Sequence, residues 1–538
     1  MHRRKSSNHQ INAALAALSA VFSYLFFRNY FEAQIRLAGL VSGGMLQYDS
    51  FYSLSFAREL LRTDNWFLFR NPFGTLDSEP HLFNGMATLL ALFRSAWINN
   101  LHLFDFMVSG IGSAVSGWFF GRWMSQCSRQ SFIFTVLWTQ MTILGSGFGF
   151  VFTFLLGSRQ MLEPLLNGSY WGLSWLMSSI ATWEILYHAV FWFGVDGIAR
   201  ESKFRSITAA LILLWLHPFT LSIYALFAVA FYGLDAIQAR TLRTKHLSSA
   251  VMIAGMFVFA AVVYNYILPM GSNDAKFFLG VYRNAYGVMH RLQFSIIPSV
   301  LISFLFPAIL SLLICWLLRN REESAFGRNW MGAAGLLSAC VLVALNLSYL
   351  LTDAVIQPAH WLRVYPIAFI MGAAVSFPVS GELRQKVIAA SIGFFLFFVA
   401  VLDSVVGAKV TVGALIKSNG PPSMLDRDLS DLIRELNLRK AWGFLYLRGC
   451  TKLTNSTEYA VSALTQAQVP FGHVYFSPFG KQAFDKQTYC GRCPKLKSSV
   501  GPRPVIVLDH ELALRCNLKS EASFGRFDIA AVDDALSQ

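Results

Sequence analysis

The feature that most constrains this chain is a series of long apolar runs that recur along most of its length. A helix of about twenty apolar residues spans the hydrocarbon core of a bilayer. The chain is 55% hydrophobic and 14% charged, whereas soluble domains carry about a quarter charged residues. The sequence therefore predicts an α-helical polytopic membrane protein with about eleven spans, near residues 11–28, 101–121, 131–157, 171–199, 206–217, 219–234, 247–268, 295–318, 330–350, 364–380 and 387–407.

Lysine and arginine residues are concentrated in every second loop between these runs. Positively charged loops stay in the cytoplasm when a membrane protein inserts. We therefore expect an integral membrane protein with a cytoplasmic N-terminus and an external C-terminus. In a bacterium this is the inner membrane with a periplasmic C-terminus, and the sequence leaves a eukaryotic origin open. The formal charge of +14 is then a topology signal, and no nucleic-acid partner is expected. The basic loops lie near residues 3–5, 122–129, 200–205, 240–245, 319–328 and 384–386.

Two of the apolar runs, 206–217 and 219–234, are short and meet at His217-Pro218. Neither run is long enough to cross a full bilayer, and half-depth helices are tolerated only where they line a cavity. We expect such a pair here. His217 then either faces the cavity as a substrate-binding residue or packs beside the proline, with its ring satisfied by a backbone carbonyl.

The topology divides the chain into a transmembrane module, 1–407, with a large first external loop at 29–100, and an external soluble domain, 408–538. A composition shift at 417–422 is typical of a linker. Beyond it, a helical pattern at 429–438 and apolar runs at 443–447 and 504–508 predict a small α/β or α+β domain.

The external domain holds four of the seven cysteines. Thiols outside a membrane favour disulfides, and four cysteines allow three pairings. We expect Cys490 or Cys493 to be bonded to Cys450 or Cys516, since longer closed loops stabilise more. The spacing of Cys490 and Cys493 also fits a zinc site or a redox dithiol.

The first external loop contains an acidic residue followed by a helical pattern. Leu54, Ala57 and Leu60 recur at helical spacing, while Arg58 falls on the other side. This pattern predicts an amphipathic helix on the membrane surface. Asp49, which precedes it, is either a helix cap or a carboxylate placed for chemistry.

The same stretch resembles a known family. Asp49 is followed by an aromatic residue, Tyr52, then by Ala-Arg-Glu-Leu-Leu at 57–61 and by Trp66. This order resembles the first external loop of the GT-C glycosyltransferases, nearest the lipid A aminoarabinose transferases and the protein O-mannosyltransferases. Glu-Pro-His-Leu-Phe-Asn at 79–84 lies where the family has a Pro-Leu motif. One departure is Ser50, where the family often has Glu.

The resemblance implies an enzyme that moves a sugar from a polyprenyl-phosphate donor to a glycan, lipid or protein acceptor at the external face. Asp49 would be the general base that deprotonates the acceptor. Substrate-binding roles are expected for Tyr52, Glu79, His81 and His217. No cofactor is expected. Asp77 or Glu79 could hold a divalent metal, as in the oligosaccharyltransferase branch, but the loop has no Asp-x-Asp and we disfavour a metal site.

Basic residues in the two middle external loops are candidates for the donor phosphate. They lie where topology does not require positive charge. Arginine suits bidentate contact with phosphate, and a cation there would stabilise the departing charge. The alternative is contact with lipid headgroups or pairing with loop acids. The residues are Lys276, Arg283, Arg291, His360 and Arg363.

Two other functions fit a polytopic chain of this kind. An O-antigen polymerase or ligase also uses polyprenyl-linked sugars, but its large external loop lies late in the chain. A transporter or flippase for lipid-linked sugars is expected to show inverted repeats and charged residues in mid-span. Neither feature is evident in this sequence.

Overall fold

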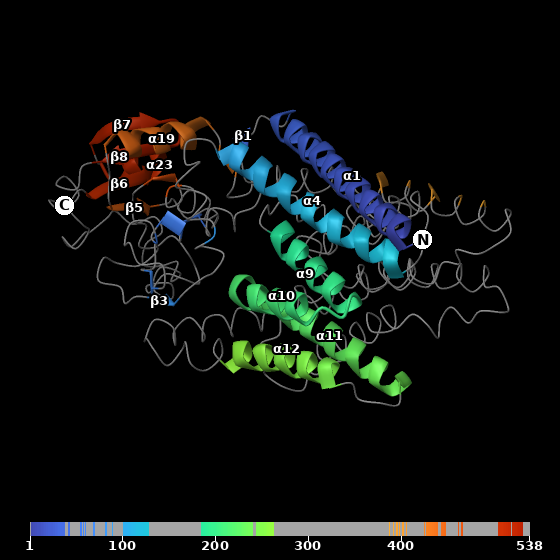
Figure 1. The fold of residues 1–538 in the computed structure, drawn as a ribbon. Helices are drawn as coiled ribbons and strands as arrows, with labels where there is room; N and C mark the ends of the chain where they lie inside the picture. Colours follow the sequence, from blue (N-terminus) through green and yellow to red (C-terminus); the bar gives the residue numbers. More distant parts are fainter. Residues whose placement is uncertain are drawn as a thin grey trace, which may run out of the picture. The chain divides into compact units, whose positions relative to one another are not determined.

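The computed structural model describes part of the chain. The described residues are 2–37, 41–42, 68–69, 81–82, 101–127, 184–239, 244–262, 424–425, 427–439, 443–447, 504–517 and 519–530, with single residues between 54 and 89, 387 and 405, and 461 and 465. The chain forms two compact units (Figure 1). Unit 1 comprises residues 1–31, 106–262 and 283–414, and unit 2 comprises residues 32–105, 263–282 and 415–538.

The described part of unit 1 is helical. The helices are α1 (His2–Leu37), α4 (Leu101–Cys127), α9 (Glu184–Ala199), α10 (Lys203–Leu216), α11 (Pro218–Ala239) and α12 (Thr244–Val262). Each coincides with a predicted apolar run or part of one, and the runs at 131–157, 295–318, 330–350 and 364–380 lie outside the described residues. Among described residues, Thr220–Ile237 in α11 is long and apolar enough to cross a membrane.

The prediction of two half-depth helices is wrong for α11. Helix α10 has 14 residues and α11 has 22, which correspond to about 21 Å and 33 Å of helix. The apolar run ends before Asp235. The helix continues past this aspartate, which has a partner on the next helix. Its carboxylate lies 2.8 Å from His246 Nδ1 of α12. Only α10 is therefore as short as the sequence predicts.

Helices α1 and α4 approach closely through small residues. A Cβ atom added at Gly117 would lie 2.7 Å from the Cβ of Ala20, and one added at Gly121 would lie 2.5 Å from the Cβ of Ala16. Small residues four apart allow helix backbones to pack closely in membranes. The contact is extended by Tyr24, whose hydroxyl donates to Ser109 Oγ at 2.7 Å.

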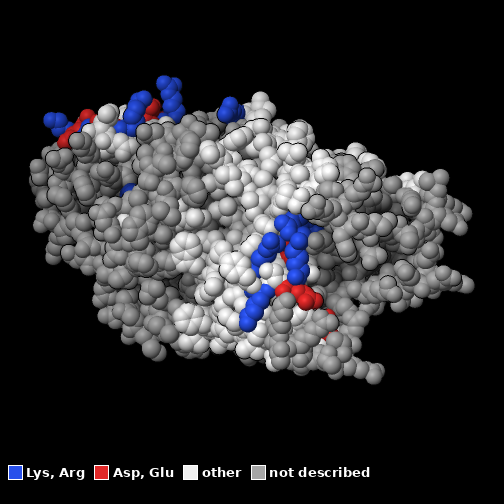
Figure 2. Space-filling model, in the orientation of Figure 1, with Lys and Arg blue, Asp and Glu red and all other residues white. Residues whose placement is uncertain are grey.

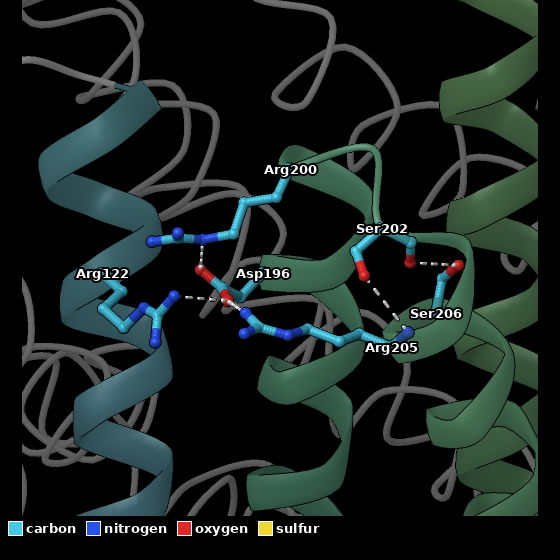
Figure 3. A network of polar contacts seen from close by, with 6 residues as sticks. All are labelled: Arg122, Asp196, Arg200, Ser202, Arg205 and Ser206. Carbon is cyan, nitrogen blue, oxygen red and sulfur yellow. Dashed lines mark hydrogen bonds and ion pairs between the residues drawn. The ribbon is translucent and has the colours of Figure 1, made fainter.

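Helices α4, α9 and α10 are joined by one buried carboxylate. Asp196 of α9 is fully buried, and three arginines converge on it (Figure 3). Arg200 Nε and Arg205 Nη1 donate to its two oxygens at 2.8 and 2.9 Å, and Arg122 Nη2 of α4 lies at 3.6 Å. A buried carboxylate is stable only when paired. The structure thus brings two of the predicted cytoplasmic basic loops to the same end of these helices.

Unit 2 contains a four-stranded mixed sheet with two helices. Strand order is β5-β6-β8-β7. Strands β5 and β6 are parallel, and the other pairs are antiparallel. The helix predicted at 429–438 and the strands predicted at 443–447 and 504–508 are present. The elements are α19 (Arg427–Leu438), β5 (Gly443–Leu447), β6 (Pro504–Asp509), α23 (His510–Arg515), β7 (Ser520–Phe524) and β8 (Phe527–Ala530).

Helix α19 packs on the sheet and fixes the turn between β7 and β8. Its buried residues are Leu429, Leu432, Ile433 and Leu436, an apolar face with helical spacing. The turn contains Gly525 with φ +55°, where a side chain would also meet the Asp428 carboxylate. Asp428 in turn accepts from the backbone N–H of Arg526 at 3.3 Å. Glycine is therefore required at this turn.

We predict that Asp196→Asn destabilises the protein by about 3 kcal/mol, because it leaves three clustered guanidinium groups without a neutralising carboxylate. Thermal unfolding of the purified protein in detergent measures the loss. Glu201→Gln removes the same charge in the neighbouring turn, where the side chain is 52% exposed, and is expected to cost less than about 0.5 kcal/mol. Equal melting temperatures for the two variants would contradict the prediction.

Candidate functional site

The described residues include few of the predicted site residues. His81 lies in β3 (His81–Leu82), and His217 and Cys516 are described with their side chains. The segments that flank Asp49 are partly described, and they define the candidate site. The predicted residues that lie outside the described residues are Asp49, Tyr52, Glu79, Lys276, Arg283, Arg291, His360, Arg363, Cys450, Cys490 and Cys493.

In the helical segment after Asp49, residues on the polar side are buried as well as those on the apolar side. Leu54, Ala57 and Leu60 are at most 1% exposed, as their spacing predicts. Ser55 is also fully buried, and Arg58 is only 7% exposed. The prediction that Arg58 lies on a solvated face is wrong. Its partner comes from a segment more than 400 residues later, which no local pattern can show.

Arg58 holds the end of a helical turn in the C-terminal part of unit 2. Its Nη1 donates to the Thr465 carbonyl oxygen at 2.9 Å. The preceding carbonyl, of Leu464, accepts from Asn437 Nδ2 of α19 at 3.1 Å. Carbonyl groups at a helix end lack partners within the helix, and a cation is favourable there. Arg58 and Asn437 thus supply those partners from two directions.

A second attachment lies before Asp49 in the sequence. Strand β1 (Val41–Ser42) pairs antiparallel with β4 (Met424–Leu425), with Val41 opposite Leu425. Farther along the loop, β2 (Leu68–Phe69) pairs antiparallel with β3, and Phe69 is opposite His81. Strand β1 and Arg58 thus both contact residues beyond 415.

His217 occupies the break between α10 and α11. Its Nδ1 lies 2.8 Å from the Thr220 hydroxyl and accepts the Thr220 backbone N–H at 3.3 Å. Its ring stacks on Tyr187, with centroids 4.2 Å apart. Nδ1 can accept from a backbone N–H only when unprotonated, which assigns the proton of the neutral ring to Nε2. The side chain therefore caps α11 through an N–H group, and a backbone carbonyl is not its partner in these contacts.

The substrate-binding role of His217 stays a prediction. A histidine that caps a helix is held in one orientation, and this fixes the direction of its second ring nitrogen. The stack on Tyr187 restrains the ring further. Both contacts are compatible with a ring that also contacts a ligand.

Cys516 follows α23 and is buried, with its backbone N–H donating to Leu512 at 3.0 Å. It is disulfide-bonded, and its partner lies outside the described residues. The pairing of the four external cysteines therefore stays a prediction. The zinc and dithiol alternatives depend on Cys490 and Cys493, which are outside the described residues as well.

One polar group of the tail was not expected from the sequence. Asp528 of β8 is buried and accepts hydrogen bonds from Ser523 Oγ and, at 3.3 Å, from Ser520 Oγ. Its other oxygen lies 2.8 Å from Nδ1 of His510, whose side chain is 46% exposed. A carboxylate that holds one nitrogen of a histidine orients the other. No sequence signal identified this pair, because Asp528 lies on a strand that is otherwise apolar.

A surface ion-pair network ties α19 to β7. Arg439 donates to Glu435 at 2.8 Å and to Glu521 at 2.6 Å. Partial burial lowers the pKa of the Arg439 guanidinium, but the hydrogen bonds and charges of the two carboxylates raise it more, so the net shift is upward. Arg439 is therefore charged at every pH at which the protein is folded.

The chain is similar to the crystal structure of ArnT from Cupriavidus metallidurans bound to undecaprenyl phosphate, with 11% identity and a TM-score of 0.47 over 95% of this chain and 97% of that chain. No family model and no curated protein match the chain.

We predict that Arg58→Met weakens the attachment of the first loop by about 2 kcal/mol, because a buried carbonyl loses a charged donor. Hydrogen exchange at residues 461–465 should become faster by a corresponding factor of about thirty.

Asn437→Ala is the matched control, since it removes a donor from the adjacent carbonyl of the same turn. That hydrogen bond is exposed, so water replaces it and the expected effect is below about 0.5 kcal/mol. Equal acceleration of exchange in both variants would show that Arg58 has no special part in the attachment.

Proposed function

We propose that this chain is a GT-C-type membrane glycosyltransferase that uses a polyprenyl-phosphate sugar donor at the external face of the membrane. The proposal rests on the first-loop motif and on the contacts that hold this loop on both sides of Asp49. The stretch that contains Asp49 lies between β1 and Arg58, and both contact the C-terminal part of unit 2. A loop held at both ends is suited to place a catalytic group precisely.

In this proposal Asp49 is the general base. Its carboxylate takes the proton from an acceptor hydroxyl or amine, and the acceptor atom attacks the anomeric carbon of the sugar. The bond between that carbon and the phosphate oxygen breaks, and the polyprenyl phosphate leaves with the electron pair. Atoms and charge balance without a metal or a redox cofactor. Tyr52, Glu79, His81 and His217 would contact the sugar or the acceptor.

The leaving phosphate gains negative charge as the bond breaks, so fixed cations around it would lower the barrier. Arg363 is the main candidate, because arginine can offer two parallel N–H groups to one phosphate. The other residues predicted to bind the donor phosphate are Lys276, Arg283, Arg291 and His360.

The C-terminal domain would recognise the acceptor or close the site. Its attachment to the Asp49 loop supports this role, because a domain that contacts both flanks of the base can bring an acceptor to it. The half-exposed ring of His510, which the buried Asp528 holds through Nδ1, is one polar feature that such an acceptor would meet.

We predict that Asp49→Asn lowers turnover by about a hundredfold or more while the melting temperature and donor binding stay unchanged. Asparagine has the same size as aspartate and caps helices about equally well, so the change removes the base and keeps any cap. Turnover of a polyprenyl-phosphate sugar by the purified protein is the measurement, repeated with a chelator to detect metal dependence. Full turnover by the variant would remove Asp49 from the mechanism.

We predict that Arg363→Ala weakens donor binding by tens of fold and leaves the protein folded. A charge-assisted hydrogen bond contributes on the order of 2 kcal/mol. Donor affinity is measured by titration of the non-turning-over Asp49→Asn protein, with and without the second change. Equal affinities would assign Arg363 to a structural pairing.

A further inference from the structure

The turn between α9 and α10 carries more positive charge than its packing requires. Arg200, Lys203 and Arg205, named here the basic cluster, lie within six residues, and Arg122 of α4 approaches the same carboxylate. Asp196 is the acid on which the arginines converge. Glu201, in the same turn, lies 3.9 Å from His246. The basic cluster with Arg122 amounts to four positive charges against the two negative charges of Asp196 and Glu201.

The arginines of the basic cluster keep donors for a further partner. A guanidinium group has five N–H donors. Arg200 uses its Nε and Arg205 uses one Nη on Asp196, and no other partner of either side chain is recorded within the described residues. The two side chains are 30% and 33% exposed. Lys203 is exposed and has no acidic partner among the described residues.

The surface beside the basic cluster is apolar. Phe204 is 77% exposed and Leu211 is 49% exposed, and residues seven apart lie on the same face of a helix. Figure 2 shows basic side chains gathered among uncharged residues, with acidic groups beside them. Aromatic side chains next to lysine and arginine are typical of the level of lipid headgroups. The basic cluster thus lies where an apolar helix face begins.

We infer that the basic cluster binds the phosphate headgroup of an anionic phospholipid, whose acyl chains lie along the face of α10 that Phe204 and Leu211 form. Arg200 and Arg205 are held in place by Asp196, so their outward donors are preorganised for a phosphate. Basic pockets between membrane helices on the cytoplasmic side bind such headgroups. This site is separate from the proposed transfer reaction, because it lies at the opposite end of α10 from His217.

The test uses the full-length protein in detergent and native mass spectrometry with phosphatidylglycerol, phosphatidylcholine and inorganic phosphate. We expect the wild type to retain phosphatidylglycerol in preference to phosphatidylcholine. Lys203→Gln should weaken phosphatidylglycerol binding about fivefold, the effect of one cation at a membrane surface. The triple change Asp196→Asn, Arg200→Gln and Arg205→Gln should weaken it more than tenfold.

The controls separate a site from net charge. The triple change lowers the net charge by one, as Lys203→Gln does. Arg427→Gln, on the 93% exposed side chain in α19, also lowers it by one and should leave binding unchanged. If the triple variant does not fold, the difference in phosphatidylglycerol binding between Lys203→Gln and Arg427→Gln tests the inference. Equal binding by these two variants, equal retention of the two lipids, or displacement by inorganic phosphate at equal concentration would each overturn the inference.

Discussion

A fully buried carboxylate at the end of α9 determines how three helices of unit 1 can meet. Asp196 needs positive charge because an isolated ion in an apolar interior is unstable. The sequence supplies that charge from the preceding α4 as well as from the turn into α10. Since guanidinium groups are rigid and planar, their positions around Asp196 restrict both the distance and the rotation of the helices that carry them. The buried aromatic contacts of the same helices then pack within this frame, for example Phe120 on Trp192 with centroids 4.7 Å apart.

The sequence patterns correctly predicted the helices and strands that are determined by residues close together in the sequence. Helix α19 and strands β5 and β6 were found at the predicted residues, because apolar spacing and turn residues fix them within a few positions. The length of α11 was underestimated, because Asp235 ended the apolar run and its partner, His246, lies on another helix. A polar residue ends a hydropathy pattern, but it does not by itself end a helix.

Arg58 illustrates the same limit at the candidate site. Its sequence neighbourhood is that of a solvated helix face, and its burial depends on a carbonyl that the sequence offers in no recognisable motif. His217 was singled out correctly as a residue at a helix break. Its actual contacts, with the N–H and hydroxyl of Thr220, depend on the exact helix boundary. Residue types at special positions can thus be predicted, while their partners require the three-dimensional structure.

The attachment of the first loop to the tail also orders events during synthesis. Arg58 and Thr465 are separated by 407 residues, and a ribosome adds about 5 to 20 residues per second. The loop therefore waits on the order of 20 to 80 seconds before its buried arginine can meet its acceptor. Until then the charged side chain must stay hydrated. This early segment of the chain is consequently among the last to reach its final conformation, and a chain that stops before residue 465 cannot complete it.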